Sequence, residues 1–319
     1  MSGKEEFSTI KARAKQKLER DMGTELLAAL NDPKTVDIML NSDGKVWQER
    51  LGEQMRHICD LRPSQAQAII ETVAGYHGKE VRRHKPILEG VFPLDGSRFA
   101  GQLPPVVAAP TFAIRKHPVA IFTLEQYVSA DIMTAQQLDV IKAAIKAHRN
   151  ILVIGGTGSG KTTLVNAIIN TMVELDPAER VVIIEDTGEI QCAAKNFIQY
   201  HTTSDVPMTL LLKTSLRMRP DRILVGEVRG PEALDLLMAW NTGHEGGAAT
   251  LHANNAKAGL SRLAMLISMN PNPPKPIEPL IGEAVHVIVH IARTSNGRRV
   301  KEILEVSGYE DGQYITKTL

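Results

Sequence analysis

A phosphate-binding loop is the clearest chemical signal in the sequence. Residues 155–162 read Gly-Gly-Thr-Gly-Ser-Gly-Lys-Thr and fit the pattern GxxxxGK[ST] without a mismatch. An apolar segment, 151–154, precedes the loop, and a segment with helical spacing follows it. Glycines let backbone N–H groups wrap around a phosphate, and the helix adds its positive N-terminal end. The loop therefore predicts a nucleoside triphosphate site, since a chance glycine-rich turn would lack this strand and helix.

Two side chains of the loop have distinct expected roles. Lys161 should reach the β- and γ-phosphates, and the hydroxyl of Thr162 should bind Mg²⁺. ATP is favoured over GTP because residues 255–258, Asn-Ala-Lys-Ala, fail the guanine-reading pattern NKxD at its final acid. The predicted nucleotide contacts are Gly155, Gly156, Thr157, Gly158, Ser159, Gly160, Lys161, Thr162 and Thr163.

Acidic residues follow two later apolar segments. Residues 181–184 lead into Glu185 and Asp186, and residues 222–225 lead into Gly226 and Glu227. Hydrolysis requires one carboxylate near the magnesium ion and another group that orients the attacking water. Each acid alone could instead cap a helix or pair with an arginine. The pattern fits both Glu185 and Glu227 as the water-activating acid and leaves the choice open.

A third cluster, residues 242–253, places His244 and His252 on either side of a short segment of small residues. A histidine at the end of a strand can sense the γ-phosphate in a nucleotide site. Structural histidines are more frequent, so this cluster is a weak signal by itself.

The elements that must position these residues form two predicted domains. Residues 1–116 read as an α+β domain, with a hairpin at 36–50, a helix at 64–76 and strands at 97–103 and 111–115. The pattern then weakens and Pro118 prevents a continuous helix, so 117–134 are predicted to be a linker.

Residues 135–319 are predicted to form the second domain, in which helices and strands alternate. This order favours an α/β fold, a parallel sheet with helices on both faces. A tail with strands at 285–292 and 299–306 either continues the sheet or forms a small appendage. The predicted helices are 135–148, 160–174, 208–218, 231–240 and 256–268, and the predicted strands are 151–154, 181–184, 222–226 and 247–251.

Composition excludes several classes of protein. The 37 Lys and Arg balance 36 Asp and Glu, and only 4% of residues are aromatic, so no strong nucleic-acid signal exists. Two isolated cysteines, Cys59 and Cys192, and the lack of a membrane-spanning apolar run predict a cytoplasmic protein. Phe7, Ile10, Ala14 and Leu18 recur at helical spacing among basic residues, which fits a helix that packs on its own domain or touches an anionic membrane.

The order of these motifs resembles that of the type II/type IV secretion traffic ATPases. The phosphate loop is followed by an Asp box at 184–190, a degenerate Walker B segment at 223–229 and a His box at 243–253. The resemblance covers about residues 30–306, and residues 38–47 look most like the conjugal transfer branch. It implies a RecA-like fold for the second domain and a hexameric ring with the nucleotide between the two domains.

The resemblance also implies a role for individual residues. Glu185 would polarise the water, Glu227 would support the magnesium shell and His252 would sense the γ-phosphate, while Glu189 is an Asp-box acid of lower rank. The family also places arginines on the nucleotide, where they neutralise transition-state charge. The matching positions here are Arg98, Arg115, Arg217 and Arg219.

The implied job is to power pilus assembly and substrate transfer in a type IV secretion or conjugation system. The expected partners are further copies of the chain and inner-membrane components of the machine, with peripheral contact at the membrane. Two rival functions use the same ATP site. One is a RecA-like nucleic-acid translocase, and the other is a nucleotide-gated scaffold with little turnover.

Overall fold

The computed structural model describes residues 2–51, 53–116, 122–203, 205–295 and 297–319, with side chains from Thr9 onward. The chain divides into two compact units, residues 1–119 and 120–319. The predicted two-domain organisation is therefore present. The part of the predicted linker at 117–121 lies outside the described residues.

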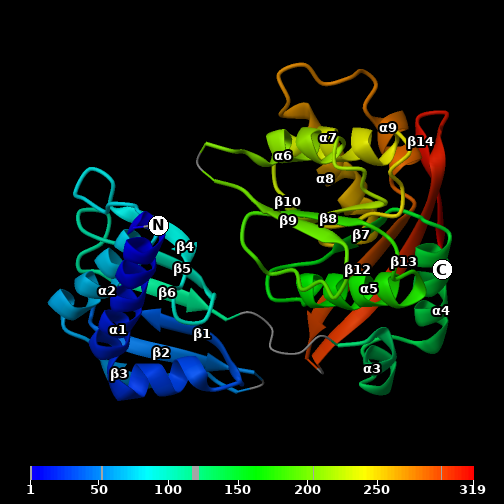
Figure 1. Ribbon diagram of the computed structural model, residues 1–319. Coiled ribbons are helices and arrows are strands. Elements are labelled where there is room, and N and C mark those ends of the chain that lie inside the picture. Colours follow the sequence, from blue (N-terminus) through cyan, green and yellow to red (C-terminus); the bar gives the residue numbers. More distant parts are fainter. Residues whose placement is uncertain (1, 52, 117–121, 204, 296) are drawn as a thin grey trace. The chain divides into compact units, whose positions relative to one another are not determined.

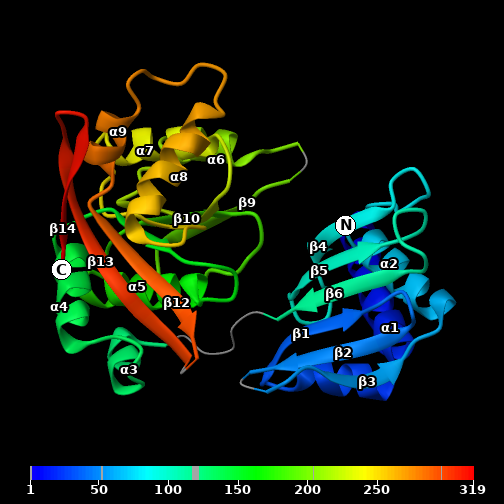
Figure 2. The same cartoon turned by 180° about the vertical axis from the view of Figure 1, so that it is seen from behind.

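The N-terminal domain is a six-stranded antiparallel sheet with two helices on one of its faces (Figures 1 and 2). The strand order is β3-β2-β1-β6-β5-β4, and the core lies between the sheet and the helices. The predicted α+β class is confirmed. The elements are α1 (Ser2–Asn31), β1 (Thr35–Leu40), β2 (Lys45–Arg50), β3 (Arg56–Asp60), α2 (Pro63–Tyr76), β4 (Ile87–Val91), β5 (Arg98–Gln102) and β6 (Thr111–Arg115).

The apolar stripe of the first helix packs on its own domain only from Leu18 onward. Leu18, Met22 and Leu26 are buried, whereas Ile10 is 53% exposed and Ala14 is half-buried. The side chain of Phe7 lies outside the described residues. The second half of α1 is therefore part of the domain core, as the four-residue spacing of its apolar residues predicts.

The second domain contains an eight-stranded sheet. Its strand order is β14-β13-β12-β7-β11-β10-β8-β9; the six strands from β12 to β9 run parallel, and β13 and β14 are antiparallel. The tail thus continues the sheet. The elements are α3 (Leu124–Ser129), α4 (Ala135–Lys146), β7 (Ile151–Ile154), α5 (Lys161–Leu175), β8 (Val181–Glu185), β9 (Phe197–His201), α6 (Met208–Ser215), β10 (Arg222–Val228), α7 (Glu232–Trp240), β11 (Ala248–Leu251), α8 (Ala256–Ser268), α9 (Glu278–Ala284), β12 (Val287–Thr294), β13 (Gly297–Glu310) and β14 (Gln313–Thr318).

Helices cover both faces of this sheet, with α3, α4 and α5 on one face and α6, α7, α8 and α9 on the other (Figures 1 and 2). The central strands β7, β8 and β11 are buried along their whole length. This explains their continuous apolar runs, because a parallel strand covered on both faces has no solvent side. The predicted α/β fold with helices on both faces is confirmed.

The predicted linker was too long. Residues 122–134 contain α3, whose start is fixed by a capping box between Thr123 and Gln126. Leu124, Tyr127 and Met133 are buried in the core of the second domain. The second domain therefore begins before α3 rather than at residue 135.

Candidate functional site

The phosphate loop joins β7 to α5 and is held tightly at both ends. A Cβ atom on Gly155 would lie 2.2 Å from the carbonyl oxygen of Ile291 and 2.6 Å from Oγ of Ser159, so only glycine fits there. Gly160, at the N-cap of α5, has φ 96°, a left-handed conformation that side chains rarely adopt. The hydroxyl of Ser159 is buried and has no hydrogen-bond partner among the described residues. These features form a cradle that fits a phosphate group.

Lys161 is folded onto its own loop. Its Nζ donates to the carbonyl oxygens of Gly155 and Gly156, both at 3.0 Å, and lies 3.4 Å from each ring nitrogen of His252. Burial lowers the pKa of Lys161, because an ammonium group loses solvation there. A hydrogen bond to a bound phosphate would compensate the ammonium group for the water that it has lost.

A hydroxyl and a carboxylate meet at the start of α5. Oγ1 of Thr162 donates to Oε2 of Glu189 at 3.3 Å. Hydroxyl and carboxylate oxygens are the ligands that Mg²⁺ prefers beside substrate phosphates. Glu189 comes from the loop after β8 and was ranked below Glu185 on sequence, yet it is the Asp-box acid that contacts the loop helix.

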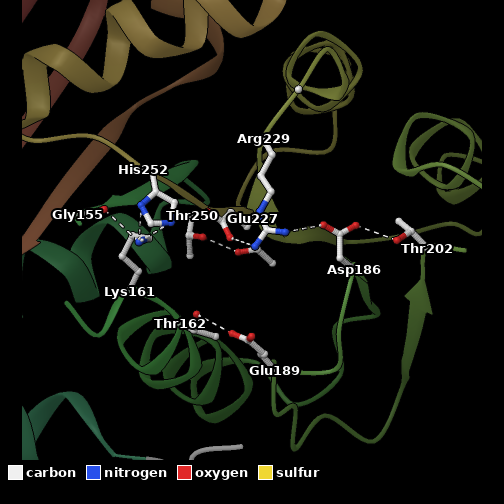
Figure 3. A network of polar contacts seen from close by, with 12 residues as sticks. Gly155, Lys161, Thr162, Asp186, Glu189, Thr202, Glu227, Arg229, Thr250 and His252 are labelled. Carbon is white, nitrogen blue, oxygen red and sulfur yellow. Dashed lines mark hydrogen bonds and ion pairs between the residues drawn. The ribbon is translucent and has the colours of Figure 1, made fainter. Parts of the chain in front are cut away.

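A line of polar contacts extends from Lys161 across the carboxyl ends of the strands (Figure 3). Nε2 of His252 lies 2.8 Å from Oε1 of Glu227, but is not aligned for a hydrogen bond. Oε2 of Glu227 accepts from Arg229 at 2.5 Å. Arg229 also pairs with Asp186 at 3.3 Å. His252 therefore lies between Lys161 and an acid, where a residue that responds to the γ-phosphate is expected.

The acids and Arg229 line one pocket together with Thr162. The full lining is Thr162, Glu185, Asp186, Thr187, Glu189, Gly226, Glu227 and Arg229. Burial lowers the pKa of His252, and the nearby charge of Lys161 lowers it further. Burial also opposes the charge of Arg229, but its bond to Glu227 raises the net pKa, so Arg229 stays charged.

The geometry argues against Glu185 as the water-polarising acid. Glu185 is only 2% exposed, and its Oε2 accepts from the backbone N–H groups of Glu189 at 2.8 Å and Ile190 at 3.0 Å. Its Oε1 accepts from the amide of Gln199 at 2.5 Å. Burial raises the pKa of Glu185 to about 7, and the three hydrogen bonds offset this only in part. The carboxylate is occupied in holding the loop that carries Glu189.

The two predicted N-terminal arginines are neighbours. Arg98 on β5 lies directly across from Arg115 on β6, and Arg115 pairs with Asp37 at 3.0 Å. Like charges directly opposite each other destabilise a sheet, and here the carboxylate of Asp37 offsets that cost. The contact of Arg98 and Arg115 with the nucleotide stays a prediction.

Arg217 and Arg219 are not brought to the phosphate loop. Both are exposed and precede β10, whereas the loop follows β7. β10 and β7 run parallel on either side of β11, so the start of β10 and the end of β7 lie at opposite ends of the strands. We call the side of the sheet where the parallel strands begin its amino edge, and the side where they end its carboxyl edge. His244 precedes β11 and lies at the amino edge for the same reason, while His252 follows β11 at the carboxyl edge. The structure thus does not support these two arginines as contacts of the chain's own phosphate site.

Sequence reasoning missed Arg229 and Thr202, which are the partners of the strand-end acid Asp186. Thr202 donates to Asp186 at 2.8 Å, and Asp186 pairs with Arg229. One signal was available for Arg229, because it lies two residues after Glu227 at the end of a strand. Side chains two apart in a strand share a face, so Arg229 should lie beside Glu227.

The fold and site together define a P-loop nucleotide-binding ATPase with a RecA-like second domain. The family described as "Type II/IV secretion system protein" matches residues 93–311, and the chain belongs to it. It is a secretion ATPase.

The chain is similar in sequence to named members of conjugation and type IV secretion systems. The chain is 45% identical over 305 residues to the conjugal transfer protein TrbB of Rhizobium radiobacter, covering 96% of this chain and 94% of that one. It is 30% identical over 311 residues to the type IV secretion system protein PtlH of Bordetella pertussis, covering 86% and 90%. The fold is similar to the pilus retraction motor PilT with bound ADP, at a TM-score of 0.64, 20% identity and coverage of 92% and 82%.

Proposed function

We propose that the chain is a Mg²⁺-dependent ATPase that works as a homohexameric motor of a type IV secretion or conjugation system, powering pilus assembly and substrate transfer. The observation that carries the ATPase part is the meeting of Lys161, Thr162, Glu189 and Glu227 at one edge of the sheet. The 45% identity to a conjugal transfer protein supports the cellular role.

The loop residues hold the triphosphate in this proposal. Backbone N–H groups of the loop and the unpartnered hydroxyl of Ser159 face the β-phosphate. Lys161 leaves the carbonyl oxygens of Gly155 and Gly156 and binds the β- and γ-phosphates instead. This exchange of partners stabilises the bound nucleotide without breaking any bond that the domain core requires.

The residues around Thr162 fit a magnesium ion. Its hydroxyl and the carboxylate of Glu189 would hold the ion together with the phosphates, with Glu227 nearby. When bound, Mg²⁺ neutralises charge that develops on the phosphate oxygens.

Glu227 is the acid we assign to water activation. Arg229 fixes one carboxylate oxygen, and the other is buried beside His252 without a hydrogen-bond partner among the described residues. This oxygen would take the proton of the attacking water once His252 moves aside on nucleotide binding. Glu185 instead holds the Asp-box loop. This division of roles differs from that expected on sequence, where Glu185 was the better candidate and Glu227 belonged to the magnesium shell.

The motor would act at the cytoplasmic side of the inner membrane. Its proposed partners are further copies of the chain and inner-membrane components of the secretion machine, with peripheral contact at the membrane. Within the part of the chain that the structure describes, each helix is too short or too polar to span a bilayer.

Steady-state phosphate release with Mg-ATP tests the ATPase and separates it from its rivals. We expect turnover in the wild type, none in Lys161→Ala, and no response to single-stranded DNA. Strong stimulation by DNA would favour a translocase. ATP binding with negligible turnover would favour a scaffold. Native mass measurement with Mg-ATP tests the ring, and a monomer at micromolar concentration would contradict it.

A further inference from the structure

The phosphate loop has two sides, and the acids occupy only one of them. β7 lies between β11 and β12 in the sheet. Glu227 on β10 and His252 after β11 are on the first side, beside Lys161. The hairpin of β12 and β13 is on the second side.

This hairpin touches the loop closely. The carbonyl oxygen of Ile291 on β12 abuts Gly155. The side chain of Arg298 on β13 lies across the loop, since its Cδ would be 3.0 Å from a Cβ on Gly160. Nε of Arg298 donates to the carbonyl oxygen of Gly158 at 3.4 Å. This hydrogen bond is longer than the usual 2.9–3.0 Å, so it holds the guanidinium loosely.

The neighbouring Arg299 differs from Arg298 in its surroundings. Arg299 donates to the carbonyl oxygen of Asp131 at 2.6 Å and pairs with the carboxylate of that residue at 2.5 Å. Arg298 is exposed, and its charge acts on Tyr127, whose pKa is raised by burial and lowered in part by Arg298. Arg299 therefore fastens the hairpin to the segment after α3, while Arg298 faces the loop.

The position of the acids fixes the direction of the bound nucleotide. The γ-phosphate must lie where Lys161, Thr162 and Glu227 meet, because hydrolysis takes place there. With the β-phosphate in the loop, the nucleoside end then leaves the loop on the side away from these groups. That side carries the hairpin and Arg298.

We propose that Arg298 binds the base and ribose of the nucleotide, with its planar guanidinium stacked on the base. An arginine side chain stacks on aromatic faces and is weakly hydrated, which suits it to this contact better than a lysine. The inference rests on the proposed ATPase function. It adds a nucleoside-binding residue from a part of the chain outside the phosphate loop, the Asp box, the Walker B segment and the His box.

Calorimetric titration of the full chain with ADP and, separately, with pyrophosphate tests this assignment. Pyrophosphate carries the phosphate groups without a nucleoside. We expect Arg298→Ala to weaken ADP binding about tenfold, in the range of an exposed-to-buried cation–π contact, and to leave pyrophosphate binding unchanged. Arg298→Lys should lose most of the same affinity, because it keeps the charge but not the plane. Lys301→Ala, which removes an exposed cation of the same strand, is the matched control and should bind both ligands as the wild type does.

Each outcome decides one question. Equal weakening of ADP and pyrophosphate by Arg298→Ala would show that the residue serves the phosphates, and would overturn the proposal. Unchanged ADP binding would also overturn it. If the wild type itself bound neither ligand, the proposed ATPase function would fail instead. Circular dichroism and thermal unfolding of each variant confirm that the fold is intact.

Discussion

The carboxyl and amino edges of the ATPase sheet both carry charged networks, but the two networks differ in burial and in partners. At the carboxyl edge, His252 and Arg229 are each about half exposed at the side chain, and Lys161 is bound to carbonyl oxygens of its own loop. At the amino edge, Arg222 is 2% exposed and pairs with the buried Glu179. Arg222 also donates to the carbonyl oxygens of Gly246 and Ile145.

Asn150 completes the amino-edge network. It is fully buried, its amide donates to the carbonyl oxygen of Ala284 at 2.8 Å, and its side-chain oxygen accepts from the N–H groups of Gly246 and Gly247. Its backbone N–H donates to Nδ1 of His286 at 2.9 Å. Buried polar groups with complete partners stabilise one structure, whereas groups with loose or exchangeable partners can change partners when a ligand binds. We therefore expect the carboxyl edge to govern turnover and the amino edge to govern stability.

The largest effect is expected at Glu227. Glu227→Gln should lower ATP turnover about 1,000-fold, or about 4 kcal/mol, because an amide cannot accept a proton from water. Binding of ADP and the free energy of unfolding should stay close to those of the wild type. Phosphate release and denaturant unfolding measure the two properties, and Glu283→Gln on the exposed surface of α9 is the control. A large loss of stability without a loss of turnover would contradict the comparison at this edge.

The next effect concerns the buried ion pair. Glu179→Ala should lower the free energy of unfolding by about 3 kcal/mol, because it leaves Arg222 buried without its carboxylate. Turnover per folded molecule should not change. Urea unfolding followed by circular dichroism measures the loss, and Glu174→Ala on the exposed face of α5 is the control. Equal stability of the two variants would show that the pair contributes little.

A smaller loss is expected at Asn150. Asn150→Ala should cost about 2 kcal/mol, because the N–H groups of Gly246 and Gly247 and the carbonyl oxygen of Ala284 then lack partners in the core. The same unfolding measurement applies. Phosphate release at a temperature well below the transition should match the wild type, and a specific loss of turnover would place Asn150 among the functional residues instead.

The smallest expected effect is a pH dependence of stability from His286. Burial lowers its pKa, and the nearby charge of Arg149 lowers it further. In the unfolded chain this residue binds a proton from about pH 6.5 downward, while in the folded chain it stays neutral to a lower pH. Its contribution to the free energy of unfolding is therefore fully present above pH 6.5 and is lost as the pH falls toward the pKa of the folded state. His286→Asn keeps an acceptor for the backbone N–H of Asn150 but cannot bind a proton. We expect the free energy of unfolding of this variant to fall by about 1 kcal/mol less than that of the wild type between pH 7 and pH 5. An unchanged pH profile would exclude His286 as a contributor.

Strands that sequence reasoning missed have one feature in common. β3 and β4 are the two outermost strands of the N-terminal sheet, and β14 and β9 are the two outermost strands of the ATPase sheet. An edge strand is exposed along one side, so it tolerates polar residues and has weak apolar periodicity. β3 reads Arg-His-Ile-Cys-Asp, for example, and has no wholly buried residue. The central strands β7, β8 and β11 were predicted within one residue at each end, because burial on both faces requires continuous apolar runs.

The assignment of the two Asp-box acids shows the same limit at the level of the site. Glu185 directly follows an apolar strand and was the stronger candidate on sequence. In the folded chain its carboxylate turns into the core and accepts hydrogen bonds from Glu189, Ile190 and Gln199. The acid that reaches Thr162 is Glu189, four residues later in the loop. The direction of a side chain at the end of a strand depends on the next strand in the sheet, here β9, which was not predicted.

The sequence by itself determined the phosphate loop and the alternation of the central strands with helices along the chain. Those features depend on local requirements, such as glycines for close backbone approach and apolar runs for buried strands. Only the tertiary structure decided which acid faces Thr162, which edge of the sheet holds each arginine, and that Arg298 lies across the loop. These outcomes depend on the order of the strands in the sheet, which no local pattern reveals. β12 and β13, for example, reach the loop from about 130 residues further along the chain.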